Sequence, residues 1–83
     1  MTTAAISAPP SRPAISSDEA LRIARIDAEK AYGDLSDFRI EILLERDGWH
    51  INYWLKDPNL NGGGPHYVIE SNTGAIVSKK YFQ

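Results

Sequence analysis

The chain has 83 residues, of which 42% are hydrophobic and 24% charged, and its formal net charge is −2 at pH 7. This composition is typical of one small globular domain rather than of a disordered chain. There is no cysteine, which excludes disulfides, thiolate nucleophiles and cysteine-ligated metals. No cluster of lysine and arginine lies along one element, which argues against a nucleic-acid partner. Any partner selected by charge should be basic.

The first 14 residues are predicted to form a disordered tail, because they are rich in Ala, Ser and Thr and contain Pro9, Pro10 and Pro13. The tail has neither the basic start nor the apolar stretch of a secretory signal, and no segment resembles a membrane span. We therefore expect a cytoplasmic protein without a membrane partner, whose single α+β domain occupies residues 15–83.

A helix is expected after this tail. Ser16 is a suitable N-cap, Glu19 completes a capping box, and Gly33 supplies the stop. At 100° per residue, one face of the helix collects apolar and mostly small side chains. These are Ala20, Leu21, Ala24, Ala28, Ala31 and Tyr32. The alanines allow this face to lie close against a sheet.

Two strands joined by a tight turn should follow the helix. Residues 38–45 alternate apolar and polar side chains, and residues 49–56 are aromatic and β-prone. Asp47-Gly48 is a strong signal for a two-residue hairpin loop. Such a loop would place Trp54 opposite Glu41, on the side of the sheet that faces away from the core.

The rest of the chain predicts a loop and two shorter strands. Residues 57–65 should form the loop, because an Asp-Pro turn opens it and three consecutive glycines are too flexible to pack. Strands follow at about 65–70 and 75–81, and a bulge at Gly74 would decide which way their residues face. The predicted fold is α+β, with one N-terminal helix packed on a four-stranded antiparallel meander sheet (α-β-β-β-β).

No reaction class assembles from the side chains. His50 and His66 lie in different strands without the short spacing of a zinc pair, and no nucleophile can be placed beside either. The glycine-rich segment before Pro65 lacks the ending of a phosphate loop and precedes a strand instead of a helix. Asp27 and Glu29 lie about 200° apart on a helical wheel, so they do not converge. We predict a protein that is not an enzyme and has no cofactor and no metal.

An apolar patch is expected on the outer face of the first hairpin. Trp54 and Leu43 share this face with Glu41, Glu45 and Asn52, in the pattern of an apolar anchor with a polar rim. The patch predicts an interface with another protein. The alternative is that the tail or a second copy of the chain covers it.

Several motifs resemble the NTF2 fold immunity proteins, a family of small proteins often encoded beside Rhs and other polymorphic toxins. The resemblance extends from Ser16 to about Tyr81. Its motifs are SDEALRIA at 17–24, AYG at 31–33, DGWHI at 47–51, GGGPHYVIE at 62–70 and TGAIV at 73–77. It implies a stoichiometric inhibitor that binds the toxic domain of its cognate effector and blocks its active site or substrate entry.

On this hypothesis, the partner-binding residues are chosen by their expected exposure. They are Glu41, Leu43, Glu45, Trp54, Asn61 and His66. The free protein would be a monomer or a homodimer, since the outer-face apolar residues also suit a contact between copies. The order of elements and the Thr73-Gly74 turn are similar to those of PepSY domains, which are associated with peptidase inhibition. That second resemblance implies a peptidase-regulating interaction module.

Overall fold

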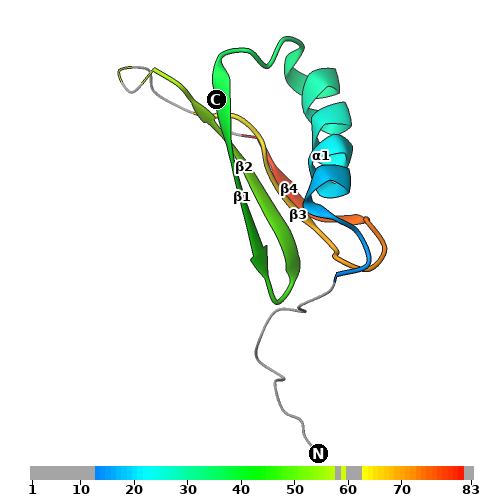
Figure 1. The fold of residues 1–83 in the computed structure, drawn as a ribbon. Coiled ribbons are helices and arrows are strands. Elements are labelled where there is room, and N and C mark those ends of the chain that lie inside the picture. Colours follow the sequence, from blue (N-terminus) through cyan, green and yellow to red (C-terminus); the bar gives the residue numbers. More distant parts are fainter. Residues whose placement is uncertain (1–12, 58, 60–62, 82–83) are drawn as a thin grey trace, which may run out of the picture.

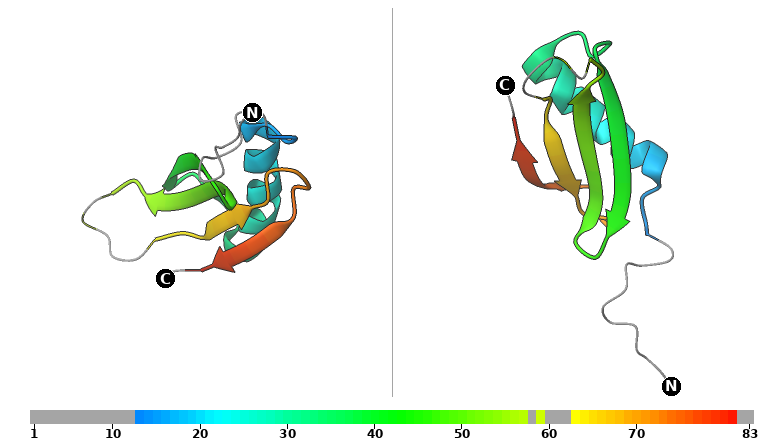
Figure 2. Two further views of the ribbon diagram at one scale, coloured as in Figure 1. Left: turned by 90° about the horizontal axis from the view of Figure 1, so that it is seen from below. Right: turned by 90° about the vertical axis from the view of Figure 1, so that its left-hand side faces the viewer.

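The computed structural model describes residues 13–57, 59 and 63–81 and confirms the α+β order of one helix followed by four strands (Figure 1). The helix is α1 (Ser17–Tyr32), and the strands are β1 (Phe38–Glu45), β2 (Gly48–Leu55), β3 (His66–Ile69) and β4 (Ile76–Lys80). The strands form one antiparallel sheet in the order β1-β2-β3-β4. Helix α1 lies across one face of this sheet, and no other described element lies against the opposite face (Figure 2).

The predicted signals mark the two ends of α1. The Ser16 hydroxyl accepts a hydrogen bond from the Glu19 N–H at 3.1 Å, which satisfies one of the free donors of the first turn. At the other end, Gly33 has φ of 77° and donates its N–H to the Glu29 carbonyl at 2.9 Å. A residue with a side chain would be strained in this left-handed conformation.

The core lies between α1 and the two central strands. It consists of Ala20, Ala24, Ala28, Ile51, Tyr53, Tyr67 and Ile69, each at most 1% exposed. Ala31, predicted for the same helix face, is exposed, because the buried contact ends one turn earlier at Ala28. The core-facing Ile40 is 48% exposed, since α1 packs on β2 and β3 and leaves β1 largely uncovered.

The register of the first hairpin differs by two residues from the predicted one. Glu45 pairs with Gly48, so the loop consists of the two residues between them. Trp54 consequently lies opposite Arg39 and not opposite Glu41. Because the shift is an even number of residues, every side chain keeps the face predicted for it.

The reason for the shift is that Gly48 is the first residue of β2 and not a residue of the turn. Its φ is 131°, and a Cβ atom at this position would lie 2.3 Å from the carbonyl oxygen of Ile69. Glycine is therefore required where β2 and β3 come close together, and not in the turn itself. A pattern of local residues cannot distinguish these two uses of a glycine.

The end of the glycine-rich segment is packed, which corrects the prediction that it is too flexible to pack. Gly63, Gly64 and Pro65 are buried. The Gly64 N–H donates to the carbonyl of Tyr53 at 3.0 Å, and the Tyr53 N–H donates to the carbonyl of Pro65 at 3.0 Å. The absence of a side chain at Gly64 lets the segment extend the β2–β3 ladder against Phe38, because a Cβ there would lie 2.8 Å from that ring.

The structure also shows to which side of the sheet the residues of the last two strands point. Tyr67 and Ile69 point into the core, so His66 and Val68 point away from it. The register between β3 and β4 shifts between Val68 and Ile69, where Val77 has no opposite partner. The irregularity therefore lies within β4 and not at Gly74.

Candidate functional site

The candidate functional site is the sheet face opposite α1, here called the outer face. Alternate residues of each strand contribute to it. They are Arg39, Glu41, Leu43 and Glu45 from β1, His50, Asn52 and Trp54 from β2, His66 and Val68 from β3, and Ser78 and Lys80 from β4. No described segment covers this face (Figure 2). Its charged side chains, apart from histidine, are Arg39, Glu41 and Glu45 on β1 and Lys80 on β4.

Trp54 is held in a fixed orientation on the outer face, near the C-terminal end of β2. Its indole Nε1 donates to Glu41 Oε1 at 3.4 Å, and Asn52 Nδ2 donates to the same oxygen at 3.1 Å. The His66 ring meets the indole edge to face, with the two ring centroids 4.6 Å apart. Trp54 is nevertheless 36% exposed, so part of its flat apolar surface remains open to a partner.

Two ionisable groups of this cluster have shifted pKa values. The hydrogen bond from Asn52, followed by that from Trp54, lowers the pKa of Glu41 below its ordinary value. Burial lowers the pKa of His66, and the negative charge of Glu41 opposes this only in part. At neutral pH the indole therefore lies between an ionised carboxylate and a neutral imidazole.

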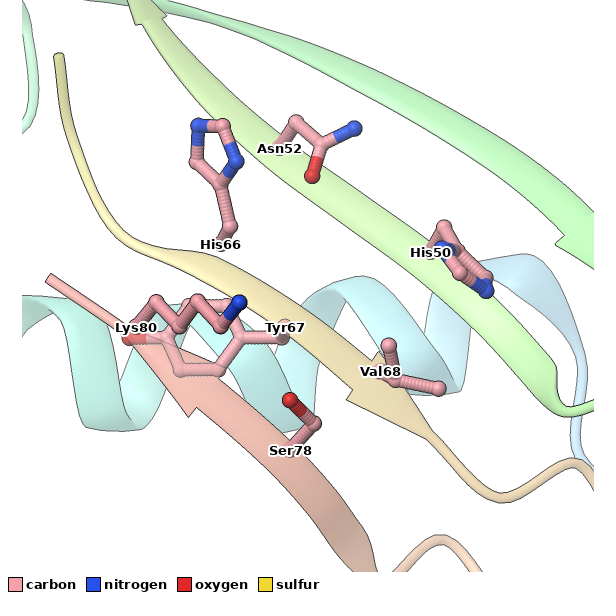
Figure 3. A pocket seen from close by; sticks show the side chains of 7 residues that line it. All are labelled: His50, Asn52, His66, Tyr67, Val68, Ser78 and Lys80. Atoms are coloured by element: carbon pink, nitrogen blue, oxygen red, sulfur yellow. The ribbon is translucent and has the colours of Figure 1, made fainter. Parts of the chain in front are cut away.

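A shallow pocket lies beside this cluster on the outer face (Figure 3). Its lining residues are His50, Asn52, His66, Tyr67, Val68, Ser78 and Lys80. Its volume of about 240 Å³ is below the range of roughly 300–1,000 Å³ that is usual for small-molecule sites. The pocket suits one side chain of a protein partner better than a metabolite.

The structure brings three of the predicted partner-binding residues together and separates the others. Glu41, Trp54 and His66 form the cluster described above. Leu43 lies opposite His50 on the same face and is 48% exposed. Glu45 lies at the end of the hairpin, where it borders a polar depression with Arg46, Asp47 and His50. Asn61 lies outside the described residues.

A second polar cluster, on the helix side of the sheet, was not predicted. Asp27 of α1 accepts hydrogen bonds from the Tyr67 hydroxyl at 2.8 Å, the Tyr81 hydroxyl at 2.6 Å and Lys79 Nζ at 3.1 Å. These donors, Tyr81 first, lower the pKa of Asp27. The cluster connects α1 to β3 and to the C-terminal end of the sheet. The one local signal for it was an aspartate next to the buried Ala28.

The described residues contain no group of three His, Cys, Asp or Glu side chains that could hold a metal ion. None of the described helices has the length and apolar character needed to cross a membrane. No family model, curated protein or solved structure matches this chain.

Proposed function

We propose that this protein binds another protein through its outer face, and that the partner is the toxic domain of a bacterial effector. Binding would neutralise the toxin by occupying its active site or substrate entry, with one copy per toxin and no covalent step. The proposal has two parts, binding through the outer face and a toxic domain as the partner. The first part rests on the exposed Trp54, which Glu41 and His66 hold in place on an uncovered sheet face. The second part, and a cytoplasmic location, are supported by the resemblance to immunity proteins.

Trp54 is suited to be the energetic centre of such an interface. Tryptophan is enriched among interface residues whose truncation costs about 2 kcal/mol or more, and such residues lie near the middle of the buried area. The hydrogen bond to Glu41 and the contact with His66 already restrict the indole in the free protein. Less side-chain freedom would therefore be lost on binding.

The residues around Trp54 supply the other parts of an interface. Leu43 and Val68 provide further apolar area, and the shallow pocket beside His66 can receive a side chain of the partner. Glu45 stands at the β1 edge as an exposed negative charge. A toxin with a basic surface around its active site would be attracted to this edge, which mainly raises the association rate.

Isothermal titration calorimetry against the toxic domain encoded beside the gene tests the proposal. We expect a one-to-one complex that Trp54→Ala weakens about 30-fold, which corresponds to about 2 kcal/mol. The matched control is Ile26→Ala, which removes a 44% exposed apolar side chain from α1, and this change should leave the affinity unaltered. Circular dichroism should show that both variants are folded.

The possible results separate the two parts of the proposal. Binding that Trp54→Ala does not weaken would show that the outer face is not the interface. Absence of a complex with the toxic domain would rule out this pairing. If a peptidase encoded nearby is bound instead, and the same variant weakens that complex, the protein is a peptidase-regulating module similar to PepSY domains.

A further inference from the structure

The two edge strands of the sheet, β1 and β4, differ in how they are protected. β4 has five residues, a register shift against β3, and Lys79 and Lys80 in its sequence. β1 has eight residues, pairs with β2 without interruption, and contains no lysine, proline or glycine. Short length, irregularity and lysine are features that prevent edge strands from pairing with other chains. β1 is long, regular and without lysine, and its charged side chains are of both signs, namely Arg39, Glu41 and Glu45.

The backbone groups on the open side of β1 can be identified from its neighbours. The N–H and C=O of Tyr53 bond to residues 64–65, on the β3 side of β2. Ile40 lies opposite Tyr53, and opposite residues of an antiparallel ladder bond either to each other through both groups or not at all. The N–H and C=O of Ile40 therefore point to the open edge. By the same alternation, the N–H and C=O groups of Ile42 and Leu44 also point to the open edge.

We propose that two copies of this chain pair antiparallel along β1, about a twofold axis at Ile42, and so form one eight-stranded sheet. In this register the backbone of Ile42 bonds to that of the partner's Ile42, and Ile40 bonds to Leu44 of the partner subunit. About six backbone hydrogen bonds result, because each bonded pair of an antiparallel ladder exchanges two. A twofold arrangement of this kind is self-limiting and yields a dimer.

The charges of the outer face select this register. With the axis at Ile42, Arg39 lies opposite Glu45 of the partner subunit, and this attractive pair forms twice. Moving the axis to Glu41 would place the two copies of that glutamate opposite each other. Moving it to Leu43 would place Glu41 opposite the partner's Glu45. Both neighbouring registers therefore bring like charges together, which is destabilising.

One further register also pairs opposite charges. An axis two residues earlier would place Arg39 opposite the partner's Glu41. It would, however, require the N–H of Phe38, which already donates to the carbonyl of Leu35 at 3.1 Å. It would also leave the open-edge groups of Leu44 unbonded. The register centred on Ile42 uses the open-edge groups of Ile40, Ile42 and Leu44 and is the one we expect.

The helix side of the sheet adds apolar contact to the same pairing. Ile40 is 48% exposed and borders a groove of about 420 Å³ between α1 and β1, which Leu21 and Tyr53 also line. Leu44 of the partner subunit would lie beside Ile40 at the open side of this groove. Pairing would thus cover the core-facing surface of the strand that α1 leaves exposed.

Sedimentation velocity on charge-reversed variants tests the proposal. The wild-type chain should be a dimer, and Arg39→Glu or Glu45→Arg alone should weaken it about tenfold or more, since each replaces two attractive pairs by two repulsive ones. The double variant should regain the wild-type affinity within about threefold. The two residues lie at opposite ends of β1, so their mutual rescue reports a contact between copies.

Lys80→Glu is the control, because it reverses a charge on the other edge strand and should not alter the dimer. A wild-type chain that remains monomeric at about 100 μM would overturn the proposal. A double variant as weak as the single variants, while folded by circular dichroism, would also overturn it. The measurement involves no toxin, so its failure would leave the proposed function untouched.

Discussion

The rings of Trp54 and His66 are so close that a positive charge on the imidazole would affect the indole. Burial lowers the pKa of His66 below its ordinary value of 6.5, so folding disfavours the charged ring. As the pH falls from 6.5, the unfolded chain takes up this proton before the folded chain does. The folded state therefore loses stability from 6.5 down to the lowered pKa and loses no more below it.

This coupling predicts a pH-dependent fluorescence signal. With Trp49→Phe removing the other tryptophan, protonation of His66 should quench Trp54, with a midpoint below pH 6.5. His66→Gln should abolish the transition, whereas His50→Gln should preserve it. A midpoint at or above 6.5 would contradict the assignment of a partly buried, neutral His66.

Within the elements, Gly48 determines how the first hairpin is aligned. Its φ of 131° and its closeness to the Ile69 carbonyl leave no room for a side chain. Gly33, at the end of α1, also has positive φ, but a Cβ there would meet nothing within 4 Å. Gly33 is therefore required only for its backbone conformation, whereas Gly48 is also required because the Ile69 carbonyl lies too close for a side chain.

We predict that Gly48→Ala costs about 3 kcal/mol or more of unfolding free energy, because backbone strain and a clash between strands combine. Gly33→Ala should cost about 1 kcal/mol, from strain alone. Urea denaturation at pH 7 measures both. Equal losses for the two variants would show that the β2–β3 contact at Gly48 relaxes without cost.

Local signals were sufficient to predict the elements, and tertiary contacts decided the rest. The N-cap at Ser16 and the alternation in residues 38–45 are properties of neighbouring residues, and both were confirmed. The other half of the predicted capping box was not, because the Glu19 carboxylate bonds the Arg22 guanidinium instead. The hairpin register was wrong because Gly48 serves a contact with Ile69, 21 positions later. The outer position of Trp54 followed from alternation. Its contact with His66 did not, because it depends on the pairing of β2 with β3.

At the scale of the whole molecule, α1 is attached to the sheet by apolar packing around its three buried alanines and by polar contacts that include the carboxylate of Asp27. The donors to Asp27 are 40, 52 and 54 residues away in the sequence. A local pattern could therefore point to Asp27, as the neighbour of Ala28, but not to its three hydrogen-bond donors. The polar cluster around Asp27 links α1 to β3 and to the C-terminal end of the sheet.

Asp27→Asn should lower the unfolding free energy by about 1–3 kcal/mol at pH 7, the usual cost of weakening a charged, partly buried hydrogen-bonded group. Because folding lowers the pKa of Asp27, the stabilisation by its charge is fully present above the ordinary pKa of 3.8. It is lost progressively as the pH falls from 3.8 through the lower pKa of the folded state. The difference between the wild type and the variant should therefore shrink in acid. Glu29→Gln on the same helix is the control, and a pH-independent difference would contradict the role of the charge.

The meander topology has a consequence for the time at which the protein becomes active. Each strand pairs with its neighbour in the sequence, so most sheet contacts close short loops. Mixed domains with such local topology fold in about milliseconds, whereas ribosomes add only about 5–20 residues per second. The 83 residues thus take seconds to synthesise and far less to fold. Folding therefore adds little to the time that synthesis takes, and the outer face can form as soon as β4 has emerged from the ribosome.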